Sequence, residues 1–348
     1  MTLREWTAKI TPPDAAAMEE ARRRQAQLAK PPGSLGRLED LSVQLAGITG
    51  RVHNKIEKKH LLVFAADNGV VDEGVSSAPR SVTLSQTINL TRGKTGAATL
   101  CKHFGCAITV CDVGVAANIR EKAVLCRKIA FGTKNIARGS AMTREECERA
   151  VLTGIELAAE TDADVLGVGE MGIGNSTPAT AINCALFGFD PDVATGPGAG
   201  SDPERVRHKA AIVRRALEVN AAALKGDGVD ILAALGGFEL AIMAGIMLGA
   251  ASRSLPILVD GFICSAAYAA AVRICPLVAQ YAILSHASAE PGHVPALGAL
   301  DSGTPLLHLD MRLGEGTGGA VAYHLLRCAV NIFNEMATFA EAQVDEGL

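Results

Sequence analysis

VLGVGEMGIGNSTP, residues 165–178, encodes a β-strand, a glycine-rich loop and the start of a helix in direct succession. The run Val165–Val168 is typical of a buried strand, and Pro178 suits the first turn of a helix. Backbone N–H groups and the helix dipole create an anion site at such a helix start, and phosphate is its natural ligand. A plain glycine turn capped by Ser176 or Thr177 fits the same letters. The stretch therefore predicts a βα unit, with phosphate binding as a hypothesis.

Five other short apolar runs end near a glycine or a polar residue and repeat this βα pattern. They are Leu61–Ala65, Ala107–Cys111, Ile231–Leu235, Ile257–Val259 and Ala282–Leu284. Because the runs are almost continuously apolar rather than alternating, they suit a parallel sheet that helices cover on both faces. We therefore expect an α/β fold with a Rossmann-like parallel six-stranded sheet, and ligands bound beyond the carboxyl ends of its strands.

The two ends of the chain indicate helices outside this sheet. Asp14 and Ser34 are candidate N-caps of two N-terminal helices, and Gly318–Phe339 has the pattern of a long apolar helix. We predict three segments from these patterns. Residues 1–55 supply the N-terminal helices of a small domain, 56–310 form a large α/β catalytic domain, and 311–348 supply a catalytic loop and a C-terminal helix that joins the small domain.

Composition and charge argue against several classes of protein. The 33 Lys and Arg against 37 Asp and Glu leave a formal charge of −4, so no basic field favours nucleic acid or an anionic membrane. No apolar stretch is long and uninterrupted enough for a transmembrane helix, and the first residues lack the pattern of a signal peptide. The nine cysteines are odd in number and never form paired C-x-x-C knuckles, which indicates reduced thiols, no zinc site and a cytoplasmic protein.

Two further segments carry candidate catalytic or binding groups. In RLGEGTGG, residues 312–319, Glu315 stands between glycines just ahead of a helix. The helix dipole there favours an ionised base, and the glycines allow a substrate to approach closely, although acids also occupy helix starts for stability alone. Lys209 lies on an expected amphipathic helix among other cations, where a solvated face fits the local pattern better than a phosphate ligand.

Other functions remain open on these patterns. Gly167-x-Gly169-x-x-Gly172 matches the dinucleotide fingerprint, so an NAD-dependent oxidoreductase is one alternative, although its helix starts later than the fingerprint requires. A non-enzymatic nucleotide-sensing module is another. His286 and His293 lack partners at metal-ligand spacing, so we expect ordinary loop histidines and no metal.

Seven segments, taken in order, resemble the nicotinate-nucleotide–dimethylbenzimidazole phosphoribosyltransferase family. They are KPPGSLGRLE (30–39), FAADNGVVDEGVS (64–76), GVGEMGIGNSTPAT (167–180), ALGGFELAIMAG (234–245), PILVDGF (256–262), SHASAEPGH (285–293) and RLGEGTGGA (312–320). Any one segment would be a weak signal, but their order and spacing cover nearly the whole chain. The family fold, a Rossmann-like sheet with a small domain of terminal helices, agrees with the fold expected from the apolar runs.

The resemblance implies an enzyme of cobamide (vitamin B12) biosynthesis that needs no cofactor or metal. The family transfers the phosphoribosyl group of nicotinate mononucleotide to a lower-ligand base, which gives the α-ribotide and nicotinate. By resemblance, Glu315 takes the proton of the acceptor and Glu170 assists near the ribose or the incoming ring. The 5′-phosphate is assigned to Lys209 and to the loop residues Gly174, Asn175, Ser176 and Thr177. Further candidate nucleotide contacts are Gly236, Asp260, Ser285, Gly314 and Gly316.

The expected pocket for the lower-ligand base departs from the family pattern. Ser76, Leu84 and Met171 are assigned to this pocket, and benzimidazole-using members carry glutamine where Leu84 aligns and leucine where Met171 aligns. These differences remove a polar contact to the ring of the base, so the sequence does not single out dimethylbenzimidazole. The acceptor expected is dimethylbenzimidazole, another base or a phenol. Family members are usually homodimers, and relatives that activate phenols can pair with a related subunit, so a homodimer is expected and a heterodimer stays open.

Overall fold

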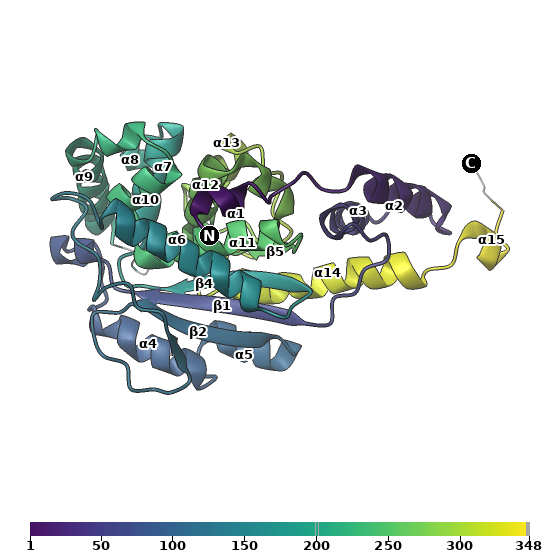
Figure 1. The fold of residues 1–348 in the computed structure, drawn as a ribbon, viewed down its shortest axis with the longest axis horizontal. Coiled ribbons are helices and arrows are strands. Elements are labelled where there is room, and N and C mark those ends of the chain that lie inside the picture. Colours follow the sequence, from purple (N-terminus) through teal and green to yellow (C-terminus); the bar gives the residue numbers. More distant parts are fainter. Residues whose placement is uncertain (199, 201, 346–348) are drawn as a thin grey trace.

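The computed structural model describes residues 1–198, 200 and 202–345, and a six-stranded sheet forms its centre (Figure 1). All strand pairs are parallel, and the strand order is β3-β2-β1-β4-β5-β6. The strands are β1 (Lys59–Ala66), β2 (Ala107–Gly114), β3 (Val124–Cys126), β4 (Val165–Met171), β5 (Ile257–Val259) and β6 (Ala282–Leu284). The expected α/β fold with a parallel six-stranded sheet is confirmed.

Side chains alternate between two hydrophobic cores on the two faces of the sheet. Along β1, Leu62 and Phe64 belong to one core, whereas Leu61 and Val63 belong to the other. Successive side chains of a strand point to opposite faces, so a strand that is apolar at every position must be covered on both sides. The continuous apolar runs of the sequence have this physical cause.

Helices cover both faces and are joined mostly by short loops. The core that contains Leu62 packs mainly against α6 (Arg144–Glu160), α7 (Ser176–Phe187), α9 (Pro203–Val219), α10 (Gly228–Leu235), α11 (Phe238–Ser252) and α12 (Phe262–Ile274). The opposite core packs mainly against α3 (Arg37–Thr49), α4 (Ser81–Thr91), α5 (Gly96–Phe104) and α14 (Thr317–Glu335). The remaining helices are α1 (Leu3–Thr7), α2 (Ala15–Gln27), α8 (Pro191–Ala194), α13 (His293–Ala299) and α15 (Phe339–Ala342), with 3-10 turns at Gly69–Glu73, Ala223–Lys225 and Pro276–Tyr281.

One predicted strand is wrong. Ile231–Leu235 lies in helix α10, and the sixth strand is instead the short edge strand β3. Asp227 caps α10, because its side chain accepts hydrogen bonds from the backbone of Val229 and Asp230 in a capping box. The predicted N-cap at Ser34 is also wrong, because Gly36 precedes α3 and makes no side-chain cap, whereas Asp14 caps α2 as expected.

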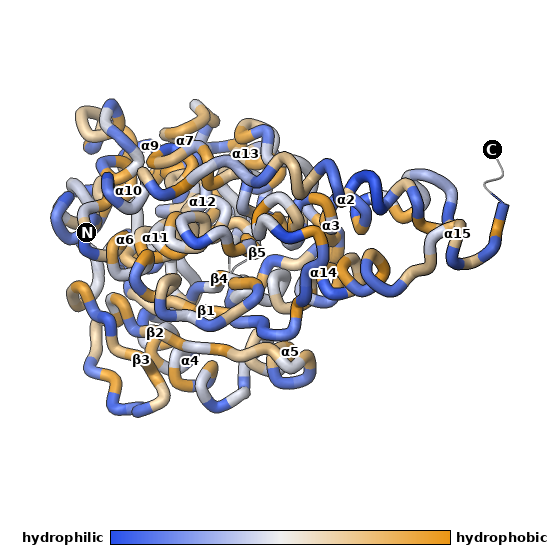
Figure 2. The backbone as a smooth tube through the Cα atoms, turned by 45° about the vertical axis from the view of Figure 1, so that its right-hand side comes forward, coloured by the Kyte–Doolittle hydropathy of each residue, from blue (hydrophilic) through white to orange (hydrophobic). Residues whose placement is uncertain are grey.

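The terminal helices α2, α3 and α14 pack side by side and extend away from the sheet (Figure 1). Arg24 of α2 donates from Nε to the carbonyl oxygen of Phe333 at 2.9 Å, which ties the N-terminal segment to the end of α14. Figure 2 shows that α2 is strongly hydrophilic, as expected for a helix that contacts the rest of the chain along one side. Helix α1 packs instead against α6 and α11. The boundaries at residues 55 and 310 stay a prediction.

The helices of the described residues include none that combines the length and the apolar character needed to cross a bilayer.

Candidate active site

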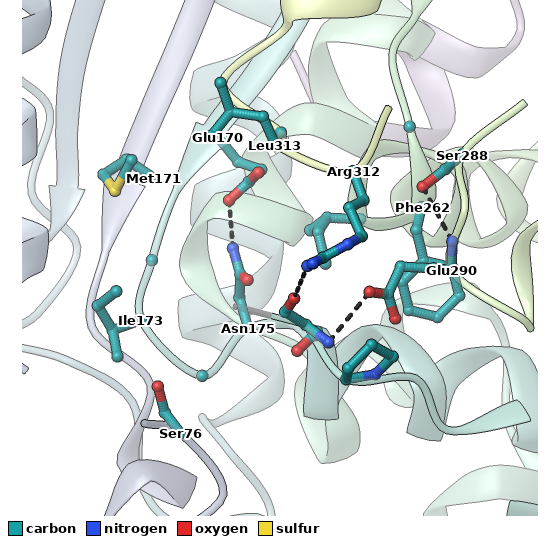
Figure 3. A pocket seen from close by; sticks show the side chains of 18 of the residues that line it. Ser76, Glu170, Met171, Ile173, Asn175, Phe262, Ser288, Glu290, Arg312 and Leu313 are labelled. Atoms are coloured by element: carbon teal, nitrogen blue, oxygen red, sulfur yellow. Dashed lines mark hydrogen bonds between the residues drawn. The ribbon is translucent and has the colours of Figure 1, made fainter. Parts of the chain in front are cut away.

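A cavity of about 540 Å³ opens beyond the carboxyl ends of β4, β5 and β6. Its lining comprises residues 75–77, 170–176, 197, 198, 200, 260–264, 286, 288, 290 and 312–314. Parallel α/β sheets bind ligands at this edge because the strand ends and the helix starts meet there. Figure 3 shows Ser76, Met171 and Ile173 on one side of the cavity and Phe262, Ser288 and Glu290 on the other, with Glu170 and Asn175 between them.

The glycine-rich segment divides into strand and loop differently from the expected pattern. Strand β4 continues to Met171, so Gly167 and Gly169 lie within the strand. A Cβ on Gly169 would lie 2.3 Å from the carbonyl oxygen of Glu315, and one on Gly167 would lie 2.6 Å from Tyr323 Oη. Glycine at these two positions leaves room for Glu315 and Tyr323, which pack against the strand at and near the start of α14. The two glycines therefore do not form a pyrophosphate-binding loop. The match to the dinucleotide fingerprint therefore lacks the strand–turn–helix context that it requires.

The loop that follows leads into the N-terminus of α7. Asn175 is the N-cap and makes no side-chain cap, and Gly174 has a φ of 84°, which favours glycine. The simple Ser or Thr cap that the sequence allowed is therefore not formed. Because α7 begins at Ser176 and points its first turn at the cavity lining, its dipole favours an anion there.

Lys209 is buried beside this loop and is not on a solvated face. Its side chain belongs to α9, is 2% exposed, and donates from Nζ to Ser176 Oγ at 2.8 Å and to the carbonyl oxygen of Gly196 at 3.0 Å. Burial lowers the pKa of Lys209 to about 8, and Glu290 acts in the opposite direction. The structure thus brings together Lys209 and the α7 loop, which the sequence separates by more than 30 residues. A buried cation beside a helix N-terminus is suited to a phosphate.

Two charged residues of the cavity escaped the sequence interpretation. Gly198 donates its N–H to Glu290 Oε1 at 3.0 Å, and Arg312 Nη1 donates to the carbonyl oxygen of Gly198 at 2.7 Å (Figure 3). A Cβ on Gly198 would lie 3.4 Å from Lys209 Nζ. Glu290 and Arg312 therefore fix the loop that adjoins the buried lysine. Both lie in segments that resemble the family, 285–293 and 312–320, and this resemblance was the signal that could have identified them.

Glu170 occupies the middle of the cavity. Asn175 Nδ2 donates to Glu170 Oε2, and a Cβ on Gly314 would lie 2.3 Å from Glu170 Oε1 (Figure 3). Burial raises the pKa of Glu170 to about 8, and the nearby carboxyl groups of Glu239 and Asp260 add to the rise. Glu170 therefore keeps its proton near neutral pH and can donate a hydrogen bond to a bound hydroxyl or ring.

The N-terminus of α14 is occupied by Asp260 and not by Glu315. Asp260 Oδ1 accepts from Gly318 N at 2.7 Å and from Gly319 N at 3.1 Å, and Oδ2 accepts from Gly316 N at 3.1 Å. Burial raises the pKa of Asp260, whereas these backbone hydrogen bonds and the nearby His286 oppose the rise. The expectation that the dipole of the following helix holds the Glu315 carboxylate is therefore wrong.

Glu315 instead contacts the start of a different helix. Its Oε2 accepts from Ala97 N, in the first turn of α5, at 3.0 Å, and its backbone adopts a φ of 62°. A Cβ on Gly96 would lie 2.7 Å from Leu313 Cδ2 and 3.5 Å from Glu315 Oε2, so Leu313 lies near this carboxylate. Leu313 is 61% exposed and lines the cavity, whereas Glu315 is buried and is not among the described lining residues.

Two of the three residues assigned to the base pocket line the cavity. Ser76 and Met171 do so together with Ile173 and Leu313, which gives a mainly apolar wall. Leu84 lies on α4 and is not among the described lining residues. Its neighbour Thr83 touches the loop, since Thr83 Oγ1 accepts from Ile173 N at 3.1 Å.

The other predicted contacts are distributed between the cavity and its supports. Gly174, Asn175, Ser176, Asp260 and Gly314 line the cavity, as do Glu170 and Met171. Ser285 lies behind it, donating from Oγ to the carbonyl oxygen of Asp260 at 3.1 Å, and Gly316 is the N-cap of α14. Thr177 is buried in α7, and Gly236 ends α10 away from the described lining.

Comparisons with known proteins agree with this geometry. A family model described as "Phosphoribosyltransferase" matches residues 10–344. The chain is 48% identical over 351 aligned positions to nicotinate-nucleotide–dimethylbenzimidazole phosphoribosyltransferase of Nitratidesulfovibrio vulgaris (strain DP4), covering 99% of this chain and 98% of that one. It is 46% identical to the enzyme of the same name from Alkaliphilus metalliredigens (strain QYMF), covering 98% of this chain and 99% of that one.

A solved structure shows the same similarity at the level of the fold. The crystal structure of CobT from Thermus thermophilus superposes with a TM-score of 0.90 at 40% identity, covering 95% of this chain and all of that one.

Proposed function

We propose that this chain, which belongs to the nicotinate-nucleotide–dimethylbenzimidazole phosphoribosyltransferase family, carries out its reaction in the cavity beyond β4, β5 and β6. The enzyme is a phosphoribosyltransferase of cobamide lower-ligand activation. It transfers the phosphoribosyl group of nicotinate mononucleotide to an aromatic acceptor and releases nicotinate. The oxidoreductase alternative loses its support, because Gly167 and Gly169 serve the packing of the strand.

The single observation that carries the proposal is the buried Lys209–Ser176 contact at the start of α7. Lys209, the N–H groups of the loop and the α7 dipole supply positive potential at one end of the cavity, where the 5′-phosphate binds. Asn175 links this end to Glu170. The ribose then lies beside Glu170, whose protonated carboxyl group donates to the sugar or to the incoming ring.

The chemistry needs one base and good positioning. The acceptor nitrogen or oxygen forms a bond to C1′ of the ribose, the bond from C1′ to nicotinate breaks, and its electron pair returns to the pyridine nitrogen. Nicotinate is a cationic pyridinium in the substrate, so it leaves without a strong general acid. The N–H or O–H proton of the acceptor passes to Glu315, and the N-terminus of α5 supplies positive potential at this carboxylate. Positioning of two bound substrates supplies much of the remaining rate enhancement.

The acceptor lies against the wall formed by Ser76, Met171, Ile173 and Leu313. This wall is largely apolar, so a benzimidazole nitrogen buried there without a partner carries a penalty of about 1–3 kcal/mol, whereas an apolar ring edge carries none. A phenol therefore gains relative to dimethylbenzimidazole.

We expect the enzyme to work as a homodimer, and a related second subunit is the alternative. A cytoplasmic location is part of the same proposal, and the nine free thiols support it, because a reducing compartment keeps them unpaired.

The test is to incubate the purified protein with nicotinate mononucleotide and one acceptor, and to follow the products by chromatography. We expect nicotinate and the α-ribotide to appear in equal amounts. Binding of nicotinate mononucleotide without turnover of any acceptor would instead favour the nucleotide-sensing module.

Acceptor choice is tested by competition. With limiting nicotinate mononucleotide and equal p-cresol and dimethylbenzimidazole, we expect the cresol ribotide to gain about tenfold for each 1.4 kcal/mol of lost polar contact. Met171→Gln should shift the product ratio towards dimethylbenzimidazole, whereas Leu84→Gln, on a residue outside the described lining, should shift it less. A strong native preference for dimethylbenzimidazole that neither variant changes would show that this wall does not select the acceptor.

A further inference from the structure

His286 directly follows Ser285 after β6, and its ring is 1% exposed yet lines the cavity. Its Nδ1 lies 3.2 Å from Ser285 Oγ and 3.6 Å from Asp260 Oδ1. Because Ser285 Oγ donates its proton to the carbonyl oxygen of Asp260, it accepts from Nδ1–H of the ring. Nε2 has no hydrogen-bond partner among the described residues.

Two glycines leave room for this ring in its orientation. A Cβ on Gly318 would lie 1.9 Å from Nδ1, so the first turn of α14 can pass over the ring only with glycine there. A Cβ on Gly261, which also lines the cavity, would lie 3.0 Å from Cε1 and 3.2 Å from Nε2. The glycine at 261 therefore keeps the Nε2 edge of the ring uncovered on the cavity side.

Few side chains of this cavity can carry positive charge, and they lie in two separate parts of it. Among the described lining residues, only Arg312 and His286 can carry it. Arg312 contacts Gly198, beside Lys209, and so belongs with the proposed phosphate end. His286 lies under the start of α14, next to Asp260, and Glu170 stands between these two parts through Asn175 on one side and Gly314 on the other.

The substrate has a matching distribution of charge. Nicotinate mononucleotide carries a phosphate at one end and a pyridine carboxylate at the other, with the ribose between them. A phosphate beside Lys209 and a ribose beside Glu170 leave the carboxylate without a cationic partner, unless His286 supplies one. Buried charges in proteins are paired or hydrogen-bonded, so the carboxylate needs such a partner.

We propose that His286 binds the carboxylate of the nicotinate ring and so selects nicotinate mononucleotide over its uncharged amide analogue. The inference rests on the proposed function, since it names a contact for the same substrate. As an imidazolium, the ring donates Nδ1–H to Ser285 and Nε2–H to the carboxylate, and Asp260 balances its charge. The amide of nicotinamide mononucleotide offers only a neutral acceptor and forms a weaker hydrogen bond.

A second histidine, the first residue of α13, provides a matched control. His293 Nδ1 accepts from Ser288 N at 2.8 Å, and its Nε2 is 2.9 Å from Ser265 Oγ. Burial lowers the pKa of His293 to about 3, so it stays neutral. Both of its nitrogens are used within the protein, and neither is available to a ligand.

The test compares kcat/KM for nicotinate mononucleotide with that for nicotinamide mononucleotide in the native enzyme, in His286→Gln and in His293→Gln. We expect His286→Gln to lower the ratio by about ten- to a hundredfold, because one charge-assisted hydrogen bond is removed. The fall should come mainly from a lower kcat/KM for nicotinate mononucleotide. His293→Gln should change stability but leave the ratio as it is. An equal loss with both substrates in His286→Gln would assign the residue a purely structural role and overturn the proposal.

A second variant keeps the test decisive if His286→Gln does not fold. Gly261→Ala retains the histidine and covers its Nε2 edge, so it should lower the same ratio. An unchanged ratio in a folded Gly261→Ala enzyme would also contradict the proposal. If the native enzyme turns over neither mononucleotide, the proposed function itself fails and this inference falls with it. Turnover with an unchanged ratio in the variants overturns only the role of His286.

Discussion

Glu315 has a hydrogen-bond partner that a glutamine can keep. In Glu315→Gln the side-chain carbonyl oxygen can still accept from Ala97 N, so the fold and the binding of nicotinate mononucleotide should be preserved. The amide cannot take a proton, and we expect turnover to fall by roughly 100-fold or more, the range for removal of a general base. Steady-state kinetics and substrate binding by calorimetry check the two parts separately. Near-normal turnover in a folded variant would remove Glu315 as the base.

Glu170 should leave a signature in the pH dependence of stability. Its pKa is raised from 4.5 to about 8 in the folded protein, so between these values the native state holds a proton that the unfolded chain has lost. The native state then binds more protons than the unfolded state, and this group makes the free energy of unfolding fall as pH rises towards about 8. Glu170→Gln removes the effect.

We therefore expect the free energy of unfolding of Glu170→Gln, minus that of the native protein, to increase between about pH 5 and about pH 8 and then to level off. Denaturant unfolding at several pH values measures this difference. Glu239 and Asp260, whose pKa values burial also raises, are present in both proteins and so largely cancel. A difference that stays flat with pH would mean that Glu170 is ionised throughout this range.

The contacts of the site residues show which parts of the site the sequence could predict. Glu170 entered through the family resemblance alone, whereas local patterns favoured a solvated Lys209 and left Glu315 open between a base and a stabilising acid at a helix start. The resemblance then assigned roles to Lys209 and Glu315. The hydrogen-bond partners within the site are distant in sequence. Glu315 accepts from Ala97 N, and Asp260 accepts from the first turn of α14. Such pairings depend on the tertiary fold, and no local spacing encodes them.

At the scale of elements, α6 and α11 cross so closely that glycine is required on both helices. A Cβ on Gly154 of α6 would lie 2.2 Å from the carbonyl oxygen of Ile242, and one on Gly245 of α11 would lie 2.0 Å from that of Val151. Backbone atoms cannot move aside as a flexible side chain can. Gly154→Ala should therefore destabilise the protein by about 1–3 kcal/mol through overpacking, despite a gain in helix propensity of up to about 1 kcal/mol.

The matched control is Gly298→Ala in α13, where a Cβ would meet nothing within 4 Å. This substitution should be neutral or stabilising by up to about 1 kcal/mol, since only helix propensity changes. Thermal and denaturant unfolding of both variants give the comparison. Similar effects of the two substitutions would contradict the close crossing of α6 and α11.

The strands that the sequence predicted correctly share one physical feature. They are apolar at nearly every position because the sheet is covered on both faces, and this signal is local. Ile231–Leu235 has the same apolar texture but forms a helix, since burial alone does not distinguish a strand from a helix. The Asp227 and Asp230 pair of the capping box was a signal in the sequence for the start of helix α10. The edge strand β3 is three residues long and partly exposed, so it lacks the apolar run that reveals the others.

At the scale of the whole molecule, α14 connects the site to the terminal helices. Its first turn is held by Asp260 beside the cavity, and its far end packs against α3 and, through Phe333, against α2. A ligand that stabilises the cavity should therefore stabilise the chain as a unit and raise its melting temperature. A ligand that binds only the native state contributes roughly 2.7 kcal/mol at a free concentration of about 100 times Kd.

Nicotinate mononucleotide should produce this stabilisation, whereas NAD should not. The proposed phosphate end at Lys209 suits a mononucleotide, whereas the strand glycines Gly167 and Gly169 pack against the chain around α14 and form no loop for a pyrophosphate. Melting curves at matched ligand concentrations check the difference. In Lys209→Met, which removes the charge but retains most of the buried volume, we expect a much smaller shift with nicotinate mononucleotide, because the phosphate loses its cation. A larger shift with NAD than with the mononucleotide would contradict this assignment of the phosphate end, whatever the variant does.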